Sequence, residues 1–187
     1  MTEPTIATTA ITAVVFAGLL TGHMIGDHPM QPNAIAAGKG RPADERLAAG
    51  VHPWTGWIHC LAHVSTYLAC QAAAMVLLAL VVPLTRPGFV AALAVSGATH
   101  AVIDRRWIVR KVVALHGGTS WSEFNYHVDQ SLHYAAMLLA AVAAARATTG
   151  LSAAVVTAAA AALIPAALAV ERHQGRRAAA RTTSRGA

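Results

Sequence analysis

Long apolar runs separated by short polar connections dominate the chain. The runs cover residues 6–26, 55–83, 88–113, 124–147 and 150–170. Each is close to the roughly 20 residues that a helix needs to cross the hydrocarbon core of a bilayer. The runs leave no room for a separate soluble domain. The sequence therefore predicts an all-α fold, a single polytopic transmembrane helical bundle of about five spans over residues 1–170.

The connections between the runs hold most of the turn-forming residues. After the first run, "HPMQPN", "GKGRPADE" and "VHP" are dense in proline and glycine, which predicts a turn followed by a surface segment. Within that segment, "PADERLAAG" fits a short interfacial helix that begins near Ala43 or Asp44 and ends at Gly50. Residues 171–187 are rich in arginine and alanine, and we expect them to form a disordered tail.

Composition and charge fit a membrane protein and suggest its orientation. Hydrophobic residues make up 56% of the chain and charged residues 12%, whereas soluble domains carry about 25% charged residues. Twelve of the 14 Lys and Arg residues lie between the first two runs, in the last part of the third run or after the fifth. The positive-inside rule then places the N-terminus outside and the C-terminal tail in the cytoplasm, in the inner (cytoplasmic) membrane. Membrane topology and contact with membrane lipid account for the net positive charge of the chain. We do not expect nucleic-acid binding, because the tail lacks interleaved aromatic residues.

Histidine and aspartate recur four residues apart in four of the five runs. Residues at this spacing share one face of a helix, and because consecutive spans run in opposite directions, all four pairs are expected near the cytoplasmic face. Polar contacts between membrane helices contribute roughly 0.6–2 kcal/mol each. Inserting an aspartate at a helix centre costs roughly 2.5–3.5 kcal/mol, so helix packing is a weak explanation for the whole set. The pairs are His23 and Asp27, His59 and His63, His100 and Asp104, and Asp129 and His133.

These residue types are the ligands of a divalent metal ion. Imidazole and carboxylate groups bind zinc, and they also bind iron and manganese. Zinc is the first expectation, with iron or manganese as alternatives. Eight candidates exceed the three protein ligands of a typical catalytic zinc, so the sequence leaves open one ion with supporting groups, or two ions. The predicted ligands are His23, Asp27, His59, His63, His100, Asp104, Asp129 and His133.

In their order along the chain, these motifs resemble a known family. "HMIGDHPMQ", "HCLAH", "HAVID" and "DQSLH" are similar, over about residues 20–140, to an uncharacterised family of bacterial and phage membrane proteins, domain of unknown function 3307. His28 stands where that family usually has an apolar residue. A looser similarity, in fold and ligand type, links the chain to membrane-bound metal-dependent hydrolases. The resemblance implies a shared polar set of His23, Asp27, Gln31, His59, His63, His100, Asp104, Asp129, Gln130 and His133.

The chemistry that this set favours is hydrolysis. A zinc ion lowers the pKa of its bound water to about 7, which suits a metal-dependent hydrolase at the cytoplasmic membrane surface. The aspartates would be ligands or acid–base groups, the glutamines would orient the substrate, and two arginines would hold an anionic or lipid-like substrate. The same arginines also fit the flanking charges of the positive-inside rule. The candidate catalytic residues are Asp27, Asp104, Asp129, Gln31 and Gln130, and the candidate substrate-binding residues are Arg105 and Arg106.

Two other classes of function stay open. Histidine and aspartate inside spans also form proton relays and ion sites, as in a small transporter or a metal-handling protein, although five spans show no inverted repeat. In a structural membrane protein, the polar cluster would only stabilise assembly. Small residues in the last two runs suit helix packing within one subunit or in a homo-oligomer.

Overall fold

The computed structural model describes residues 3–117 and 123–183, which form α-helices and connecting turns without a strand. This confirms the all-α class for the described part of the chain. Five segments are long and apolar enough to cross a membrane. They are Ile6–Asp27, Trp57–Leu78, Arg86–Asp104, Glu123–Arg146 and Gly150–Arg181.

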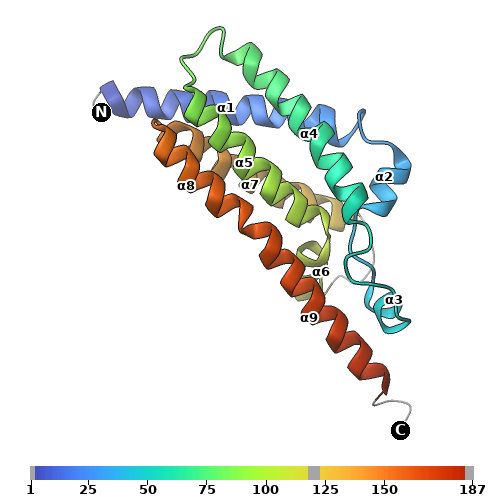
Figure 1. Cartoon of the computed structure of the whole chain (residues 1–187). Helices are drawn as coiled ribbons and strands as arrows, with labels where there is room; N and C mark the ends of the chain where they lie inside the picture. The colour runs from blue at the N-terminus through green and yellow to red at the C-terminus, as the bar shows by residue number, and fades with distance from the viewer. Residues whose placement is uncertain (1–2, 118–122, 184–187) are drawn as a thin grey trace.

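Four long helices pack into a bundle, and the remaining helices cover one side and one end of it (Figure 1). Around the bundle, α1 packs on α4, α4 on α5, α5 on α7 and α7 on α1, while α8 lies against α5 and α9 against both α3 and α5. The helices are α1 (Glu3–Asp27), α2 (Asn33–Gly38), α3 (Asp44–Ala48), α4 (Trp57–Leu78), α5 (Arg86–Asp104), α6 (Trp107–Leu115), α7 (Glu123–Arg146), α8 (Gly150–Ala161) and α9 (Leu163–Thr183).

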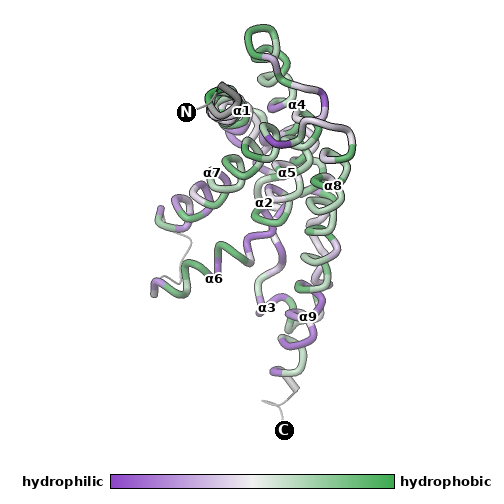
Figure 2. Tube along the Cα trace, turned by 90° about the vertical axis from the view of Figure 1, so that its left-hand side faces the viewer, coloured by the Kyte–Doolittle hydropathy of each residue, from purple (hydrophilic) through white to green (hydrophobic). Residues whose placement is uncertain are grey.

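The bundle axis is apolar at one end and polar at the other. Val15, Leu19, Met75, Ala92 and Met137 form a buried core, which the alanines of α7 allow to close tightly. Towards the other end, each of the four helices buries a histidine or an aspartate instead. The hydrophilic connections and the C-terminal part of α9 gather beyond this polar end (Figure 2).

Helices α1 and α4 approach each other backbone to backbone at Gly22. A Cβ atom there would lie 2.5 Å from the Cα atom of Gln71. We expect Gly22→Ala to destabilise the protein by about 1–3 kcal/mol, the usual cost of overpacking a filled interior. Thermal unfolding in detergent measures this as a lower midpoint. Gly150→Ala is the control, because nothing lies within 4 Å of a Cβ at Gly150, and equal midpoints for the two variants would contradict the prediction.

The predicted short helix after the first run is confirmed: α3 has Ala43 as its N-cap, and Gly50 follows it with a φ of 89°. The predicted third span of 88–113 is wrong, because α5 ends at Asp104 and α6 is a separate helix. Arg106 has a φ of 64°, in the left-handed region, and breaks the helix between them.

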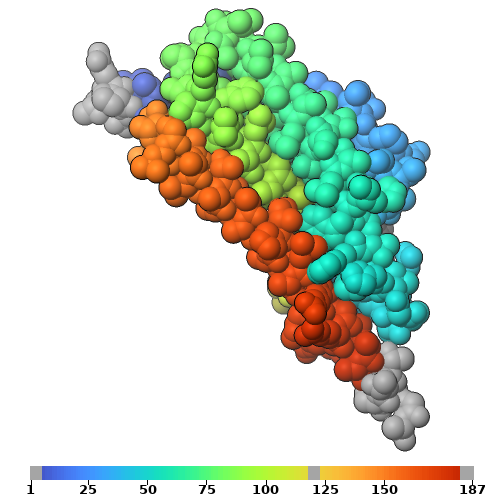
Figure 3. Space-filling view, in the orientation of Figure 1, coloured from blue at the N-terminus to red at the C-terminus, as the bar shows by residue number. Residues whose placement is uncertain are grey.

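Two further differences concern the C-terminal part. The expected tail from residue 171 is helical up to Thr183, as the continuation of α9, and lies against α3 (Figure 3). Alanine favours such a continuation, and Glu171 at its start is fully buried. The preceding helix, α8, is interrupted at Ala162, three residues before Pro165. Proline has no backbone N–H group and therefore cannot donate the hydrogen bond that a continuous helix needs there.

Candidate metal centre

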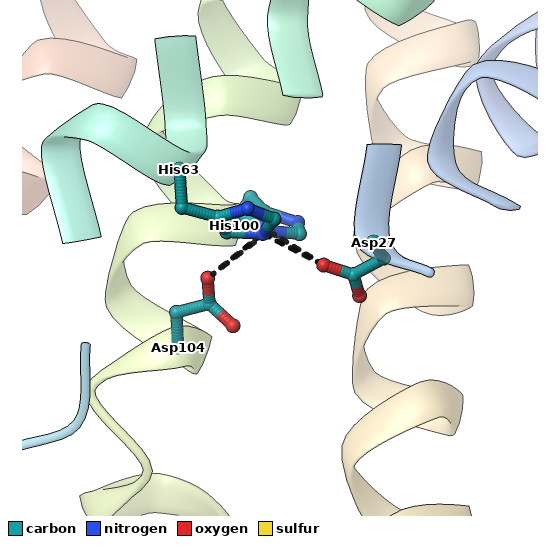
Figure 4. Close-up of side chains that lie close together, drawn as sticks. All are labelled: Asp27, His63, His100 and Asp104. Carbon is teal, nitrogen blue, oxygen red and sulfur yellow. Dashed lines mark hydrogen bonds and ion pairs between the residues drawn. The ribbon is translucent and has the colours of Figure 1, made fainter. Parts of the chain in front are cut away.

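Four side chains from three helices converge at the polar end of the bundle (Figure 4). Asp27 is the last residue of α1, His63 belongs to the first half of α4, and His100 and Asp104 lie at the end of α5. His100 and Asp104 point the same way because they stand four residues apart on one helix face. Three helices therefore supply four potential ligands to one point.

The four ligand atoms lie close enough to share one ion. The Nε2 atom of His63 is 2.7 Å from Oδ1 of Asp27, 3.0 Å from Nε2 of His100 and 3.4 Å from Oδ2 of Asp104. The Nε2 atom of His100 is 3.5 Å from Oδ1 of Asp27 and 3.1 Å from Oδ2 of Asp104. Ligand atoms about 2.0–2.1 Å from a tetrahedral zinc lie roughly 3.3–3.4 Å apart. The five separations, from 2.7 to 3.5 Å, bracket this value, and all four ligand atoms lie within 4.8 Å of one another.

Burial makes two neighbouring carboxylates costly unless positive charge accompanies them. The side chains of His63, His100 and Asp104 are at most 2% exposed and that of Asp27 is 6% exposed. Among the described residues, Oδ2 of Asp104 and Nδ1 of His100 are buried without a hydrogen-bond partner. Buried carboxylates need pairing or a metal, and two carboxylates with two imidazoles form the donor set of a divalent ion. Oδ2 of Asp104 would face that ion, whereas Nδ1 of His100 is the ring nitrogen opposite the converging Nε2 atom.

Lys39 also reaches this centre, which the sequence did not predict. Its Nζ atom is 2.7 Å from Oδ1 of Asp104 and 3.7 Å from Oδ1 of Asp27, and its side chain is buried. Lys39 follows α2, in a connection that the sequence predicts to be a surface segment. Its position between Gly38 and Gly40 is the one feature of the sequence that sets it apart. The ammonium group supplies one positive charge to two buried carboxylates.

Two further predicted ligands, His23 and His133, border the centre from α1 and α7. The Nδ1 atom of His23 is 3.8 Å from Oδ2 of Asp27, and the Nε2 atom of His133 is 3.9 Å from Oδ1 of Asp104. Both ring atoms are buried without a hydrogen-bond partner in the described part of the chain. Each of the two histidines thus faces the second oxygen of a carboxylate in the centre. His23 faces Oδ2 of Asp27, and His133 faces Oδ1 of Asp104.

Gln130 and Asp129 hold these histidines in place. The Nε2 atom of His23 lies 3.0 Å from Oε1 of Gln130, and the Nδ1 atom of His133 lies 2.9 Å from the backbone oxygen of Asp129. The Gln130 amide also donates to Oδ2 of Asp129, at 3.3 Å. In this structure both residues orient histidines beside the centre.

The structure does not bring His59 or Gln31 to the four converging atoms. His59 is exposed, one helical turn nearer the start of α4 than His63, and its ring lies beside Gly38 of α2. Gln31 lies half-buried in the turn after α1, where its Nε2 atom has no hydrogen-bond partner among the described residues. The i,i+4 spacing places His59 on the same face of α4 as His63. His59 lies one turn further from the bundle interior, where no described residue of α1 or α5 provides a ligand beside it.

Arg105, predicted to bind a substrate, makes its contacts within the protein in this structure. The fully buried guanidinium donates from Nε to Oε1 of Glu171 at 2.7 Å, from Nη1 to the carbonyl of Lys39 at 2.9 Å and from Nη2 to that of Thr55 at 2.9 Å. It also lies over the ring of Trp57. No side of this group is left for a substrate.

The side chain of Arg106 is half-buried, and its Nη2 atom donates to the carbonyl of Ala36 at 2.9 Å.

Polar contacts continue a short distance from the centre into the bundle. The ring of Tyr67 stacks on His100 with centroids 3.7 Å apart. Its hydroxyl lies 2.9 Å from Oγ of Ser96 and accepts from Nε2 of Gln71 at 2.7 Å. Gln71 also donates to the carbonyl of Leu19. Leu19 belongs to the apolar core, so the polar contacts end there.

A family model described as protein of unknown function (DUF3307) matches residues 15–163. The match contains every residue of the centre. No curated protein and no solved structure matches the chain. The family description carries no activity, so the function has to be argued from the site.

Proposed function

Since this chain belongs to DUF3307, a family of proteins of unknown function, we propose a function from its centre: an integral membrane protein that binds a divalent metal ion and uses it for hydrolysis. The observation that carries the proposal is the convergence of Asp27, His63, His100 and Asp104 in a buried cluster. Zinc suits two nitrogen and two oxygen ligands at tetrahedral spacing, with iron and manganese as alternatives.

The exposed surface of the bundle supports insertion into a membrane. Large apolar side chains point outwards, with Leu77 67%, Leu139 63% and Leu151 77% exposed. The polar side chains buried inside the bundle include His23, His63, His100, Asp104 and His133. Apolar groups outside and polar groups inside are expected when lipid is the solvent. The basic residues of α3, α6 and α9 lie beyond the polar end. The positive-inside rule assigns that end to the cytoplasm, and the protein to the inner membrane.

Three of the four residues are enough for a catalytic zinc, which keeps one position for water. We assign His63, His100 and Asp27 as ligands, because Lys39 already contacts Asp104 at 2.7 Å. When bound, the ion would lower the pKa of its water to about 7. Asp104 would accept the proton of that water, and Lys39 would hold Asp104 in position. Such chemistry at a membrane surface suits an anionic or lipid-like substrate.

Metal content tests the first part of this proposal. Elemental mass spectrometry of the detergent-purified protein is expected to find about one equivalent of zinc, iron or manganese per chain, because Lys39 takes the place where a second cation would meet Asp104. A folded protein that stays empty after incubation with each of these ions would refute the metal centre. Hydrolysis of phosphate-ester, carboxylic-ester and amide probes then tests the second part. If metal-loaded protein cleaves none of these probes, the hydrolase activity is refuted and only the metal-binding part of the proposal stands.

A transporter is the second candidate, favoured by the contacts that run from His100 through Tyr67 to Gln71. The apolar core of Val15, Leu19 and Met75 opposes it, because an ion would meet no polar group there. Proteoliposomes containing a zinc-sensitive or a pH-sensitive dye are expected to show no flux above that of empty liposomes. Flux that disappears in His100→Ala would support transport instead.

A further inference from the structure

A second polar cavity lies outside the metal centre, among α3, α6 and the C-terminal part of α9. Its volume is about 540 Å³, within the range of about 300–1,000 Å³ that small-molecule sites occupy. Five basic side chains line it against two acidic ones, Asp44 and Glu45. The basic residues are Arg41, Arg110, Lys111, Arg177 and Arg181.

Buried polar atoms on the wall of this cavity lack partners. Nε of Arg41 and Nε1 of Trp107 are buried donors without a hydrogen-bond acceptor among the described residues, and the side chain of Arg41 is 6% exposed. Native structures rarely leave such donors unpaired. Gln174 also lines the cavity, and its Oε1 atom is a buried acceptor without a partner among the described residues. The unpaired donors of the lining residues outnumber this acceptor, which favours a ligand with oxygen atoms.

The surroundings of these donors are positively charged. Arg41 forms one ion pair, from Nη2 to Oδ1 of Asp44 at 2.8 Å, and Arg110 donates to the carbonyl of Arg41 at 3.1 Å. Burial, and next the charge of Arg41, lower the pKa of Arg110. A bound anion would relieve this repulsion between neighbouring guanidinium groups.

We propose that this cavity binds a phosphate-bearing anion, either the headgroup of an acidic phospholipid or a soluble phosphate compound. Arginine side chains present planar pairs of donors that match phosphate oxygens, and Nε1 of Trp107 adds a neutral donor. Basic pockets at the cytoplasmic ends of membrane helices suit anionic headgroups. The cavity is separate from the metal centre, and the proposal holds whether or not the centre binds an ion.

Calorimetric titration of the detergent-purified full chain tests the proposal with inorganic phosphate and with dihexanoyl phosphatidic acid, and dihexanoyl phosphatidylcholine is the reference lipid. Lys111→Gln/Arg177→Gln removes two exposed cavity charges. Arg172→Gln/Arg176→Gln is the matched control, with the same charge change on exposed α9 residues that line other surface hollows. We expect saturable binding that weakens about tenfold or more in the first variant, because hydrogen bonds to charged groups are strong, and stays unchanged in the second.

The source of the phosphate follows from the two probes. Binding of phosphatidic acid alone supports a lipid headgroup, and binding of both probes with equal affinity supports a soluble phosphate compound. Trp107→Phe is an independent test, because it keeps an aromatic side chain, removes Nε1 and is expected to weaken either probe several-fold. No saturable binding, or equal weakening in both charge variants, overturns the proposal, because the basic residues would then act only as a diffuse charge.

Discussion

Replacing His63 by alanine is expected to empty the metal centre, whereas the same substitution at His59 leaves the metal content unchanged. His63 is 1% exposed, and its Nε2 atom lies within 3.4 Å of ligand atoms on the other three residues of the centre. His59 is exposed on the same helix. Even residues that only support metal ligands contribute about 10–100-fold to metal affinity, so losing a ligand should weaken binding by more than about 100-fold.

Competition with a chelator of known affinity measures this difference on detergent-purified protein, together with elemental mass spectrometry. Gel filtration and circular dichroism show whether each variant keeps its fold. His63→Ala protein that retains its ion with unchanged affinity would contradict the assigned ligands. Equal loss in His59→Ala would show that the whole start of α4, not one imidazole, determines metal content.

Replacing Arg105 by alanine is expected to produce the largest loss of stability. Glu171 is 0% exposed and receives two hydrogen bonds from Arg105, at 2.7 and 3.2 Å. Without the arginine, the buried carboxylate would keep the hydrogen bond from Nε1 of Trp57, at 2.8 Å, but it would lack a counter-ion or have to take up a proton. Breaking a buried ion pair from one side typically costs about 3–5 kcal/mol. The midpoint of thermal unfolding in detergent should fall markedly.

Two companion variants show whether the charge is responsible. Arg172→Ala, an exposed arginine next to Glu171, should unfold at nearly the wild-type temperature. Arg105→Met/Glu171→Leu removes both charges and should recover much of the loss, because replacing a complete buried pair by apolar groups is often neutral. A double variant no more stable than Arg105→Ala would mean that the hydrogen bonds to the carbonyls of Lys39 and Thr55 dominate.

The helical fold followed from the apolar pattern, but the break in the third run did not. After Asp104 the sequence "WIVRKVVAL" continues to look like a buried helix, and only the left-handed backbone at Arg106 separates α5 from α6. That conformation depends on the contacts of its neighbours, including the burial of Arg105. A local pattern of hydrophobic residues contains no information about such long-range contacts.

The same lack of information about long-range contacts made the metal centre only partly predictable. The i,i+4 spacing selected His63, His100, Asp27 and Asp104, and helix direction predicted their common depth. The same spacing could not separate His59 from His63, because both occupy one helix face and only the packing of α1 and α5 decides which one meets partners. Lys39 was missed because its position depends on the bond between its carbonyl and Arg105.

The pair of Arg105 and Glu171 also has a consequence for biosynthesis. The two residues are separated by 66 positions, so the ribosome delivers the arginine well before its partner. During that interval the guanidinium of Arg105 lacks its counter-ion, which arrives only with α9. A chain that stops short of Glu171 would keep this charge without a counter-ion, and we expect it to be less stable than a chain that contains α9. The salt bridge thereby makes the stability of the bundle depend on synthesis of the last helix.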